Sequence, residues 1–272
     1  MGTRRRRSRN MSKAQCNLGF MYNEGHGVKQ DYSKARKWYE KAAKQENASA
    51  QSNLGFMYDQ GQGVKQDYSK AREWYEKAAK QDHANAQFNL GAMYSHGQGG
   101  KQDYSKARAW WEKAAKEDHA LAQCNLGVMY EYGKGVKQDY FKALNWYEKA
   151  AKQEHAKAQC NLGFMYNEGH GVKQDYSKAR KWYEKAAKQE NASAQCNLGF
   201  MYATGEGVKQ DYFKAREWWE KAAKQEHSGA QFSLGFMYER GDGAEQSDSD
   251  AMRWYGRATA QGHDEAKQRC DA

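Results

Sequence analysis

The chain has no proline among its 272 residues. Proline is the strongest helix breaker, so its absence argues against a proline-rich linker or a fold made mostly of turns. The sequence also lacks an apolar run of roughly 18 residues, the length that a membrane-spanning helix requires. No apolar stretch of roughly 7–15 residues follows the basic start, as a secretory signal would need. The chain as written is therefore expected to be cytoplasmic, or periplasmic or secreted if an N-terminal segment is missing.

A block of 36 residues recurs seven times and dominates the sequence. Self-similarity at a fixed period between about 20 and 50 residues indicates a repeat architecture, in which small units stack and bury their faces against their neighbours. The function of such a chain is expected to lie in a surface rather than in a pocket. A Leu-Gly pair marks the register, with the leucine at Leu18, Leu54, Leu90, Leu126, Leu162, Leu198 and Leu234.

The second repeat begins with a predicted amphipathic helix. Its apolar residues Ala50, Leu54, Met57 and Tyr58 stand at i, i+4, i+7 and i+8, which places them on one face. Gly55 lies inside this helix and weakens it by about 1 kcal/mol relative to alanine. Because every repeat keeps this glycine, we expect another helix to approach closely there.

A second helix is predicted after a glycine-rich loop. Gly61 suits the left-handed conformation that ends a helix, and Asp67 is a good N-cap for the next one. In the helix that follows, Tyr75 and three alanines share one face. Glu76 and Lys80 stand at i and i+4 in the favourable orientation for an ion pair. Each repeat is thus predicted to be a helix hairpin.

The first ten residues form a basic segment with five arginines and no acidic residue. We predict a disordered arm over residues 1–10, a repeat solenoid over 11–272 and a capping final unit over 229–272, which ends in a short closing helix at 264–272. The arm could contact nucleic acid or an acidic membrane, although Met11 offers an alternative translation start. The last unit carries polar residues in place of the loop valine and the Asp-Tyr pair, as expected of a cap.

Four of the five cysteines occupy one repeat position. Equivalent positions in stacked helices lie about 10 Å apart, whereas a disulfide needs Cα atoms within about 7 Å. We therefore predict buried, unpaired thiols in a reducing compartment, with Cys270 in the tail as the odd one out. The four equivalent residues are Cys16, Cys124, Cys160 and Cys196.

The motif A-x-A-Q-x-x-L-G-x-M-Y-x-x-G-x-G-V-x-x-D-Y-x-K-A-x-x-W-Y-x-K-A-A resembles the Sel-1-like repeat family, which is related to the tetratricopeptide repeats. The match spans nearly the whole chain. The resemblance implies an all-α fold, a right-handed α-solenoid of about seven helix hairpins. It also implies an adaptor that holds other proteins, often in bacteria. The matching positions of the third repeat are Leu90, Gly91, Met93, Tyr94, Gly97, Gly99, Asp103, Tyr104, Ala107, Trp110, Ala114 and Ala115.

Comparison of the repeats within the chain separates an invariant framework from variable positions on the first helix. In related helix-pair solenoids this variable face lines a concave groove. An apolar ladder edged by polar side chains is predicted there, which suits an extended peptide or a partner helix. Alternatively, the phenylalanines pack between neighbouring repeats. The predicted groove residues are Phe20, Asn23, Phe56, Asp59, Ser95, Val128, Glu131, Phe164, Asn167, Phe200, Phe236 and Glu239.

No catalytic site, metal site or cofactor is predicted. Four histidines share one connection position, but neighbours along a stack lie about 10 Å apart, whereas zinc ligands lie about 2 Å from the metal. We interpret them as exposed loop residues. The Gly-x-Gly loops recur in every repeat and lack the strand and lysine of a phosphate loop. The four histidines are His83, His119, His155 and His227.

We hypothesise a non-enzymatic scaffold or adaptor, monomeric, whose partner is a protein or peptide. A second hypothesis is a cell-envelope protein that interacts with β-lactams or peptidoglycan, which a few cysteine-rich relatives in the family suggest, although no nucleophile stands out here. A third hypothesis is nucleic-acid binding through the arginines or through aromatic rings beside cations. The acidic residues that accompany the lysines, and the packing positions of most Tyr and Trp, disfavour the third.

Overall fold

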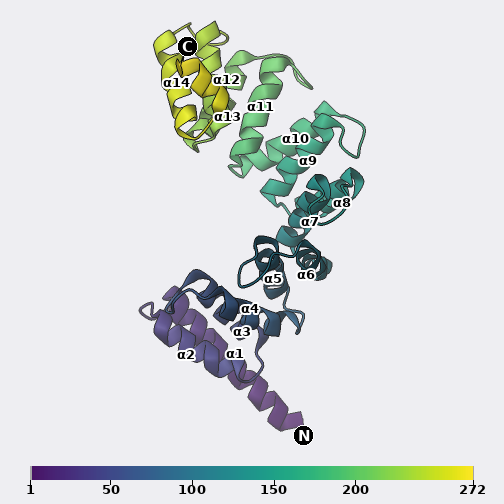
Figure 1. Ribbon diagram of the computed structural model, residues 1–272, viewed down its shortest axis with the longest axis vertical. Coiled ribbons are helices and arrows are strands. Elements are labelled where there is room, and N and C mark those ends of the chain that lie inside the picture. Colours follow the sequence, from purple (N-terminus) through teal and green to yellow (C-terminus); the bar gives the residue numbers. More distant parts are fainter. Residues whose placement is uncertain (1, 272) are drawn as a thin grey trace. The chain divides into compact units, whose positions relative to one another are not determined.

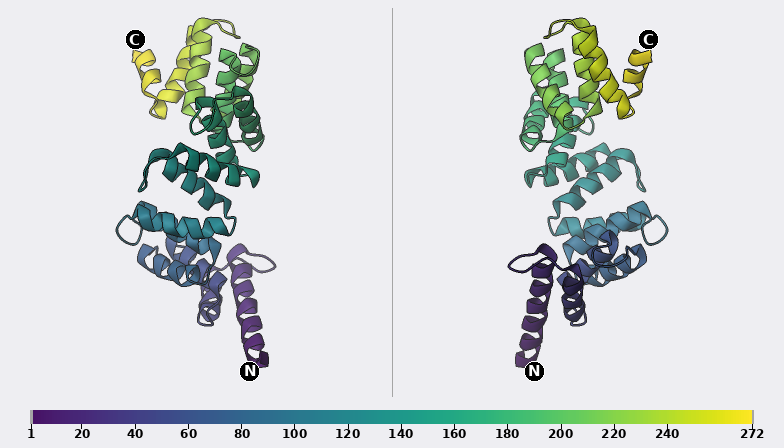
Figure 2. Two further views of the ribbon diagram at one scale, coloured as in Figure 1. Left: turned by 90° about the vertical axis from the view of Figure 1, so that its right-hand side faces the viewer. Right: turned by 90° about the vertical axis from the view of Figure 1, so that its left-hand side faces the viewer.

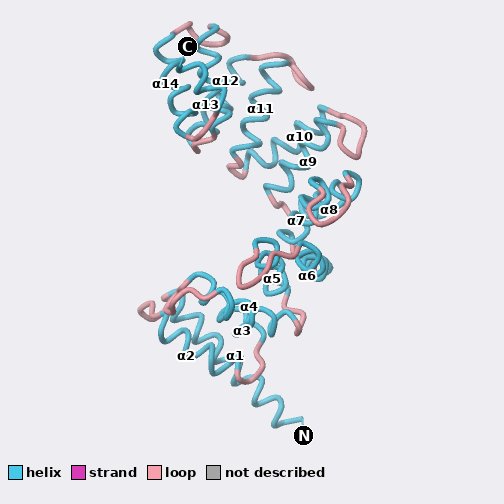
Figure 3. The backbone as a smooth tube through the Cα atoms, in the orientation of Figure 1, coloured by secondary structure: helices cyan, strands magenta, loops and turns pink. Residues whose placement is uncertain are grey.

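The structure is a computed structural model that describes residues 2–271, with side chains from Arg6 onward. Within these residues the chain forms fifteen α-helices and no strand. The tube in Figure 3 accordingly alternates between helix and loop colours. The all-α fold predicted from the helical spacing of apolar residues is confirmed. None of the described helices combines the length and the apolar character that a bilayer crossing demands.

The helices fall into two compact units, which divide between Gln138 and Asp139. Unit 1, from purple to dark teal in Figure 1, is a series of antiparallel helix hairpins. Its helices are α1 (Gly2–Glu24), α2 (Tyr32–Ala43), α3 (Ala48–Gln60), α4 (Tyr68–Ala79), α5 (Ala84–His96), α6 (Tyr104–Lys116) and α7 (Ala120–Tyr132).

Unit 2 continues with the same kind of hairpin and ends in a short helix, drawn from teal to yellow in Figure 1. That last helix coincides with the predicted closing helix, and Ala272 lies outside the described residues. The helices of unit 2 are α8 (Tyr140–Lys152), α9 (Ala156–Glu168), α10 (Tyr176–Lys188), α11 (Ala192–Thr204), α12 (Tyr212–Lys224), α13 (Ser228–Arg240), α14 (Asp248–Ala260) and α15 (Asp264–Asp271).

Two kinds of cap define the ends of each hairpin. At the end of α3, Gly61 adopts a left-handed φ of 70°, and its N–H donates to the carbonyl of Met57. At the start of α4, the Asp67 carboxylate accepts from the Lys70 backbone N–H at 3.0 Å, and this hydrogen bond lowers the pKa of the carboxyl group. Both predicted caps are confirmed. The aspartate cap recurs at Asp31, Asp103, Asp139, Asp175 and Asp211.

Small and aromatic side chains form the core of each hairpin. In the second repeat, Leu54 of α3 and Tyr75 of α4 are fully buried. A Cβ placed on Gly55 would lie 2.7 Å from Cδ1 of Tyr75, closer than side chains approach one another. The close approach expected at this glycine is therefore present, and an aromatic ring of the second helix makes it.

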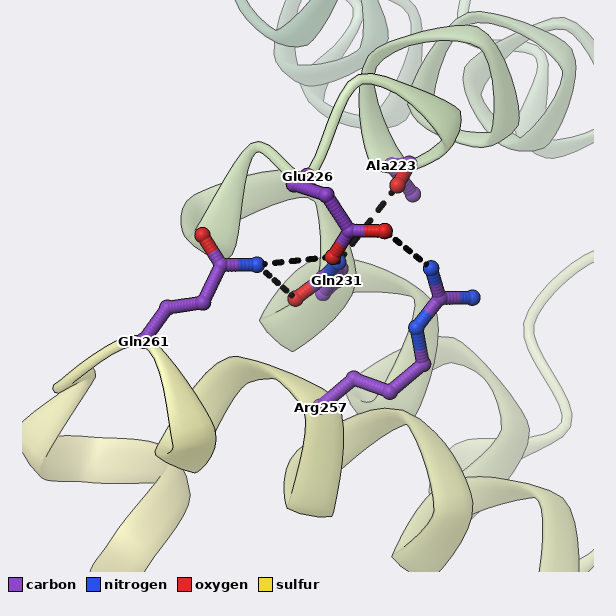
Figure 4. A network of polar contacts seen from close by, with 5 residues as sticks. All are labelled: Ala223, Glu226, Gln231, Arg257 and Gln261. Atoms are coloured by element: carbon purple, nitrogen blue, oxygen red, sulfur yellow. Dashed lines mark hydrogen bonds and ion pairs between the residues drawn. The ribbon is translucent and has the colours of Figure 1, made fainter.

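A glutamine in the first helix of a repeat joins three helices. Gln51 of α3 donates from Nε2 to the carbonyl of Ala43 at the end of α2, and its Oε1 accepts from Gln81 after α4 at 2.8 Å. We call this arrangement the glutamine staple. Figure 4 shows its last copy, in which Gln231 donates to the carbonyl of Ala223 and accepts from Gln261. In these copies the staple joins a repeat to the preceding one through hydrogen bonds between uncharged groups.

The basic N-terminal segment differs from the predicted disordered arm at residues 1–10. Gly2–Asn10 continue α1, and Figure 2 shows this end of the helix reaching beyond the helices packed around it. Arginine is a good helix former, and no glycine or proline interrupts the chain between Thr3 and Leu18, so the packed helix propagates toward its N-terminus. The side chains from Arg6 to Met11 are exposed. Met1 lies outside the described residues.

The ion pair of Glu76 also differs from the predicted pairing with Lys80. Glu76 accepts from Arg72, one turn earlier, at 3.2 Å. The guanidinium of Arg72 lies 4.0 Å from the ring centroid of Tyr94 in the next repeat. This stacking holds the planar arginine in place, and so favours Arg72 over the flexible Lys80 as the partner of Glu76. Such a partly exposed pair contributes only about 0.2–1 kcal/mol.

Candidate binding groove

The predicted groove phenylalanines lie at the surface of both units. In unit 1, Phe20 of α1 and Phe56 of α3 are 48% and 43% exposed. In unit 2, Phe164 of α9 and Phe200 of α11 are 37% and 46% exposed, while Phe236 of α13 is half-buried. These exposed fractions argue against the alternative that the rings only fill the space between repeats. Each unit thus presents apolar rings at one repeated position of its first helices.

The other predicted groove residues differ in how far they reach the surface. Ser95 and Glu131 are buried, and the short Ser95 side chain donates to a backbone carbonyl of its own helix at 3.0 Å. Glu239 accepts from the hydroxyl of Tyr255 and pairs with Arg269. The side chains of Ser95 and Glu239 are therefore engaged within the chain. The half-buried residues are Asn23, Asp59, Val128 and Asn167.

Unit 2 contains a cavity of about 500 Å³ at the phenylalanine positions of its last repeats. Phe200, Phe232 and Phe236 line it together with the buried indole of Trp219. Phe200 meets Trp219 edge-to-face, with ring centroids 5.3 Å apart. The indole is fixed because its Nε1 donates to the carbonyl of Cys196 at 3.1 Å. A volume of this size lies in the range of about 300–1,000 Å³ found for ligand pockets.

Two arginines border the cavity, and both already have acidic partners. Nε of Arg240 lies 3.2 Å from Oδ2 of Asp242, and the guanidinium of Arg269 pairs with the carboxylate of Glu239. Their guanidinium carbons lie 5.3 Å and 5.9 Å from the ring centroid of Phe236. Because a charged occupant would compete with these pairs, the cavity favours an uncharged apolar side chain.

Sequence reasoning missed Phe232, Trp219 and Arg269 as parts of this cavity. Phe232 shares its repeat position with the buried cysteines, and Trp219 shares its position with fully buried tyrosines, so neither position stands out as part of a binding site. Phe232 is half-buried, as is Phe88 at the same repeat position. The signal that could have found Arg269 is its place on the predicted closing helix, one turn after Glu265, which also lines the cavity.

The connection histidines are not the exposed loop residues that we predicted. Each is half-buried and caps the helix that follows, as His83 does by accepting from the Ala86 N–H at 3.3 Å. Burial lowers the pKa of His83, and it does the same for His155 and His227. Among the described residues, no group of three or more His, Cys, Asp or Glu side chains is placed to hold a metal ion.

All five cysteines are thiols rather than disulfides in the described structure. The four at the shared repeat position are buried, and Cys270 is half-buried. Burial raises the pKa of the Cys196 thiol to about 12 and also raises that of Cys16. Reactive cysteines require the opposite shift, toward the thiolate at neutral pH. Cys16 and Cys196 therefore serve packing in the described structure.

The profile of the Sel1 repeat family matches the chain seven times, once for each repeat, at residues 12–47, 48–83, 84–119, 120–155, 156–191, 192–227 and 228–263. The comparison with curated proteins found no match. The matched segments run through both units and contain the Leu-Gly pair, the aspartate caps and the phenylalanine positions described above.

Solved structures are similar over almost the whole chain. A protective antigen of uropathogenic Escherichia coli that displays an SLR fold is 36% identical over 96% of this chain, with a TM-score of 0.85, and this chain spans 56% of its length. A Sel1 repeat protein from Oxalobacter formigenes is also 36% identical over 96% of this chain, with a TM-score of 0.77, and this chain spans 75% of it. An immunity protein from Pseudomonas aeruginosa is 21% identical over 83% of each chain, with a TM-score of 0.51, and shares the fold alone. The chain, as its repeat motif predicts, is a member of the Sel1 repeat family.

Proposed function

We propose that the protein is a non-catalytic interaction scaffold that binds a peptide or helix of a partner protein along its exposed phenylalanines. Sel1 repeat proteins are typically interaction scaffolds, and their fold is typically non-catalytic. The observation that carries the proposal is the exposed phenylalanine at one repeated position of α9 and α11 in unit 2, Phe164 and Phe200, of which Phe200 also lines the aromatic cavity.

Energetics support an aromatic anchoring surface. Full burial of a phenylalanine side chain contributes about 1.5–3 kcal/mol relative to leaving it in water. Interface energy is concentrated in a few aromatic and arginine side chains near the centre of a contact. Phe200 and Phe236 combine these properties, because both rings are partly exposed and two guanidinium groups lie beside Phe236.

The cavity specifies which part of a partner would be held most tightly. Its walls are aromatic, and the arginines at its edge are already paired with acids. A large uncharged side chain, aromatic or aliphatic, therefore fits better than a charged one. The exposed ring of Phe164 on α9, which precedes α11 in unit 2, would then contact neighbouring residues of the same bound segment.

Peptide selection tests this function without knowledge of the natural partner. Peptides selected on the wild-type protein from a random display library are expected to carry a large apolar residue. Their affinity should fall at least about tenfold, or 1.4 kcal/mol, on the double variant F200S/F236S, because two anchors are lost. The measurement is the Kd of one selected peptide by isothermal titration calorimetry.

The matched control is F213S. Phe213 of α12 is 70% exposed but does not line the cavity, and the chain itself uses serine at this repeat position in Ser33, Ser69, Ser105 and Ser177. The control should bind as the wild type does. Unchanged binding by F200S/F236S, with its helical circular dichroism retained, would remove the groove assignment.

A further inference from the structure

At five junctions between successive helix hairpins, a histidine caps the helix that begins immediately after the junction. At the start of α5, Nδ1 of His83 accepts a hydrogen bond from the Ala86 backbone N–H at 3.3 Å. This is the position where aspartate, asparagine or serine usually caps a helix. The same contact, at 3.2–3.3 Å, is made at the starts of α7, α9, α13 and α15 by His119, His155, His227 and His263.

Two junctions have asparagine at the same repeat position. Asn47 caps α3 and Asn191 caps α11, and each Oδ1 accepts from a backbone N–H at 2.9 Å. An asparagine amide does not change its charge with pH, whereas histidine titrates near neutrality. The same N-cap position is thus occupied by a titratable residue at some junctions and by a non-titratable residue at others.

Histidine can make this cap only in its neutral form. The acceptor Nδ1 must be unprotonated, so the proton of the ring resides on Nε2. At His119, Nε2 lies 3.1 Å from Oδ1 of Asn85, a contact that this tautomer satisfies by donating. Protonation converts the acceptor into a donor and adds a positive charge at a helix N-terminus, where the helix dipole opposes it.

The packing of the rings also opposes protonation. The five histidines are half-buried. His119 stacks on Phe88 and His263 stacks on Phe232, with ring centroids 4.8 Å and 4.6 Å apart. Lys157, two residues after His155, adds a repulsive charge to that ring. Burial at His83, His155 and His227, together with the Lys157 charge beside His155, favours an uncharged imidazole at these three caps.

Acidic residues precede four of these histidines, and three of them have partners in the glutamine staple. Figure 4 shows Glu226, next to His227, accepting from Gln231, Arg257 and Gln261 at 2.9, 2.8 and 3.0 Å. Asp118 precedes His119, and Gly262 stands before His263. Acids engaged in this way are directed to amide and guanidinium groups rather than to the neighbouring ring. The staple glutamine makes the corresponding contact with Asp82 and Glu154.

We propose that the caps made by His83, His155 and His227 make the junctions entering α5, α9 and α13 pH-sensitive, so that mild acidification loosens them while the asparagine-capped junctions entering α3 and α11 stay closed. The device acts on the packing between repeats and does not depend on the proposed binding function.

The direction follows from linkage. The ordinary histidine pKa is about 6.5, and burial lowers the pKa of His83, His155 and His227 in the folded chain. Folding therefore favours the neutral ring. The caps contribute their full stability above a pH of about 6.5 and lose it as the pH falls toward the lower folded-state pKa.

Exchange of the caps tests the proposal. Urea midpoints are measured at about pH 7.5 and about pH 5.5, on either side of the histidine range. The wild-type midpoint should fall at least about twice as far between the two pH values as that of the variant H83N/H155N/H227N, because asparagine caps keep their hydrogen bond over this range whereas protonated histidine caps lose it. The reverse variant N47H/N191H should fall further than the wild type. Equal shifts in the three proteins would overturn the proposal.

A local measurement separates capping from general acid instability. Hydrogen exchange of the capped alanine amides is followed in the wild type at both pH values. Protection at Ala86, Ala158 and Ala230, which histidines cap, should fall relative to that at Ala50 and Ala194, which asparagines cap. Comparing alanine with alanine removes the intrinsic pH dependence of exchange. Parallel changes in the two sets would contradict the proposal even where all variants fold.

Discussion

At the scale of single residues, a departure from the repeat pattern breaks one copy of the glutamine staple. Glu117 stands where the second repeat has Gln81. An ionised glutamate has no proton to donate, and Oε1 of its expected partner Gln87 is buried without a hydrogen-bond partner among the described residues. A buried unsatisfied acceptor costs about 1–3 kcal/mol.

Glu117→Gln should therefore stabilise the protein. The new amide can donate to Gln87 as Gln81 does to Gln51, so the free energy of unfolding should rise by about 1 kcal/mol. Urea denaturation followed by circular dichroism measures the change.

The reverse substitution in an intact staple provides the control. Gln189 donates to Gln159 at 2.9 Å, and Gln189→Glu should lower the free energy of unfolding by a similar amount. The interpretation of the staple fails if both substitutions shift the stability in the same direction.

At the scale of helices, hairpin packing depends on a glycine that faces an aromatic ring. A Cβ on Gly163 of α9 would lie 2.7 Å from Cδ1 of Tyr183 in α10. The Tyr183 ring is buried and cannot move aside without displacing its neighbours. Gly256 of α14 is different, because nothing lies within 4 Å of its added Cβ.

Gly163→Ala and Gly256→Ala should therefore have opposite effects. The first overpacks the hairpin and should lower the free energy of unfolding by about 1–3 kcal/mol. The second removes a flexible residue from a helix interior and should raise it by about 0.5–1 kcal/mol. Thermal unfolding of the two variants beside the wild type measures both effects. Stabilisation by alanine at both sites would mean that the close approach at Gly163 is not required.

At the scale of the whole molecule, contacts are local along the chain. Within each unit the main contacts join helices that are adjacent in sequence, such as α9 with α8 and α10, with smaller contacts between successive first helices. Stability in such a chain is a sum of repeat terms and nearest-neighbour terms. A local defect is therefore expected to remain local.

Hydrogen exchange of the Gly163→Ala variant tests this locality. Protection should fall in α9 and α10, which contain the clash, while α1–α4 of unit 1 should exchange as they do in the wild type. A loss of protection that is equal in α1–α4 and in α9–α10 would indicate one cooperative unit instead.

The fold could be predicted from sequence because each repeat gives an independent copy of the same signals. The Gly61 and Asp67 caps and the Gly55 contact are local features, and each is present as expected. The helical form of the basic segment was not predicted, because charge density suggested disorder while the intrinsic helix propensity of arginine favoured the helix.

The candidate site could be predicted only in part. The surface exposure of Phe20, Phe56, Phe164 and Phe200 follows from helix periodicity. The aromatic cavity depends on how α15 packs beside α13, and the sequence alone does not give the distance between these two helices. The caps were missed because histidine is not a usual N-cap residue. The clue was the equivalence of His83 with Asn47 in the repeat alignment.

The central claim is that the phenylalanine face of the first helices holds a partner. Photocrosslinking in the native cell tests it most directly, with a photoreactive phenylalanine analogue placed at Phe200 in one variant and at the exposed Phe213, outside the cavity, in another. We predict a discrete protein adduct from position 200 and none of that mass from position 213. An adduct from position 213 alone, or identical adducts from both positions, would contradict the account.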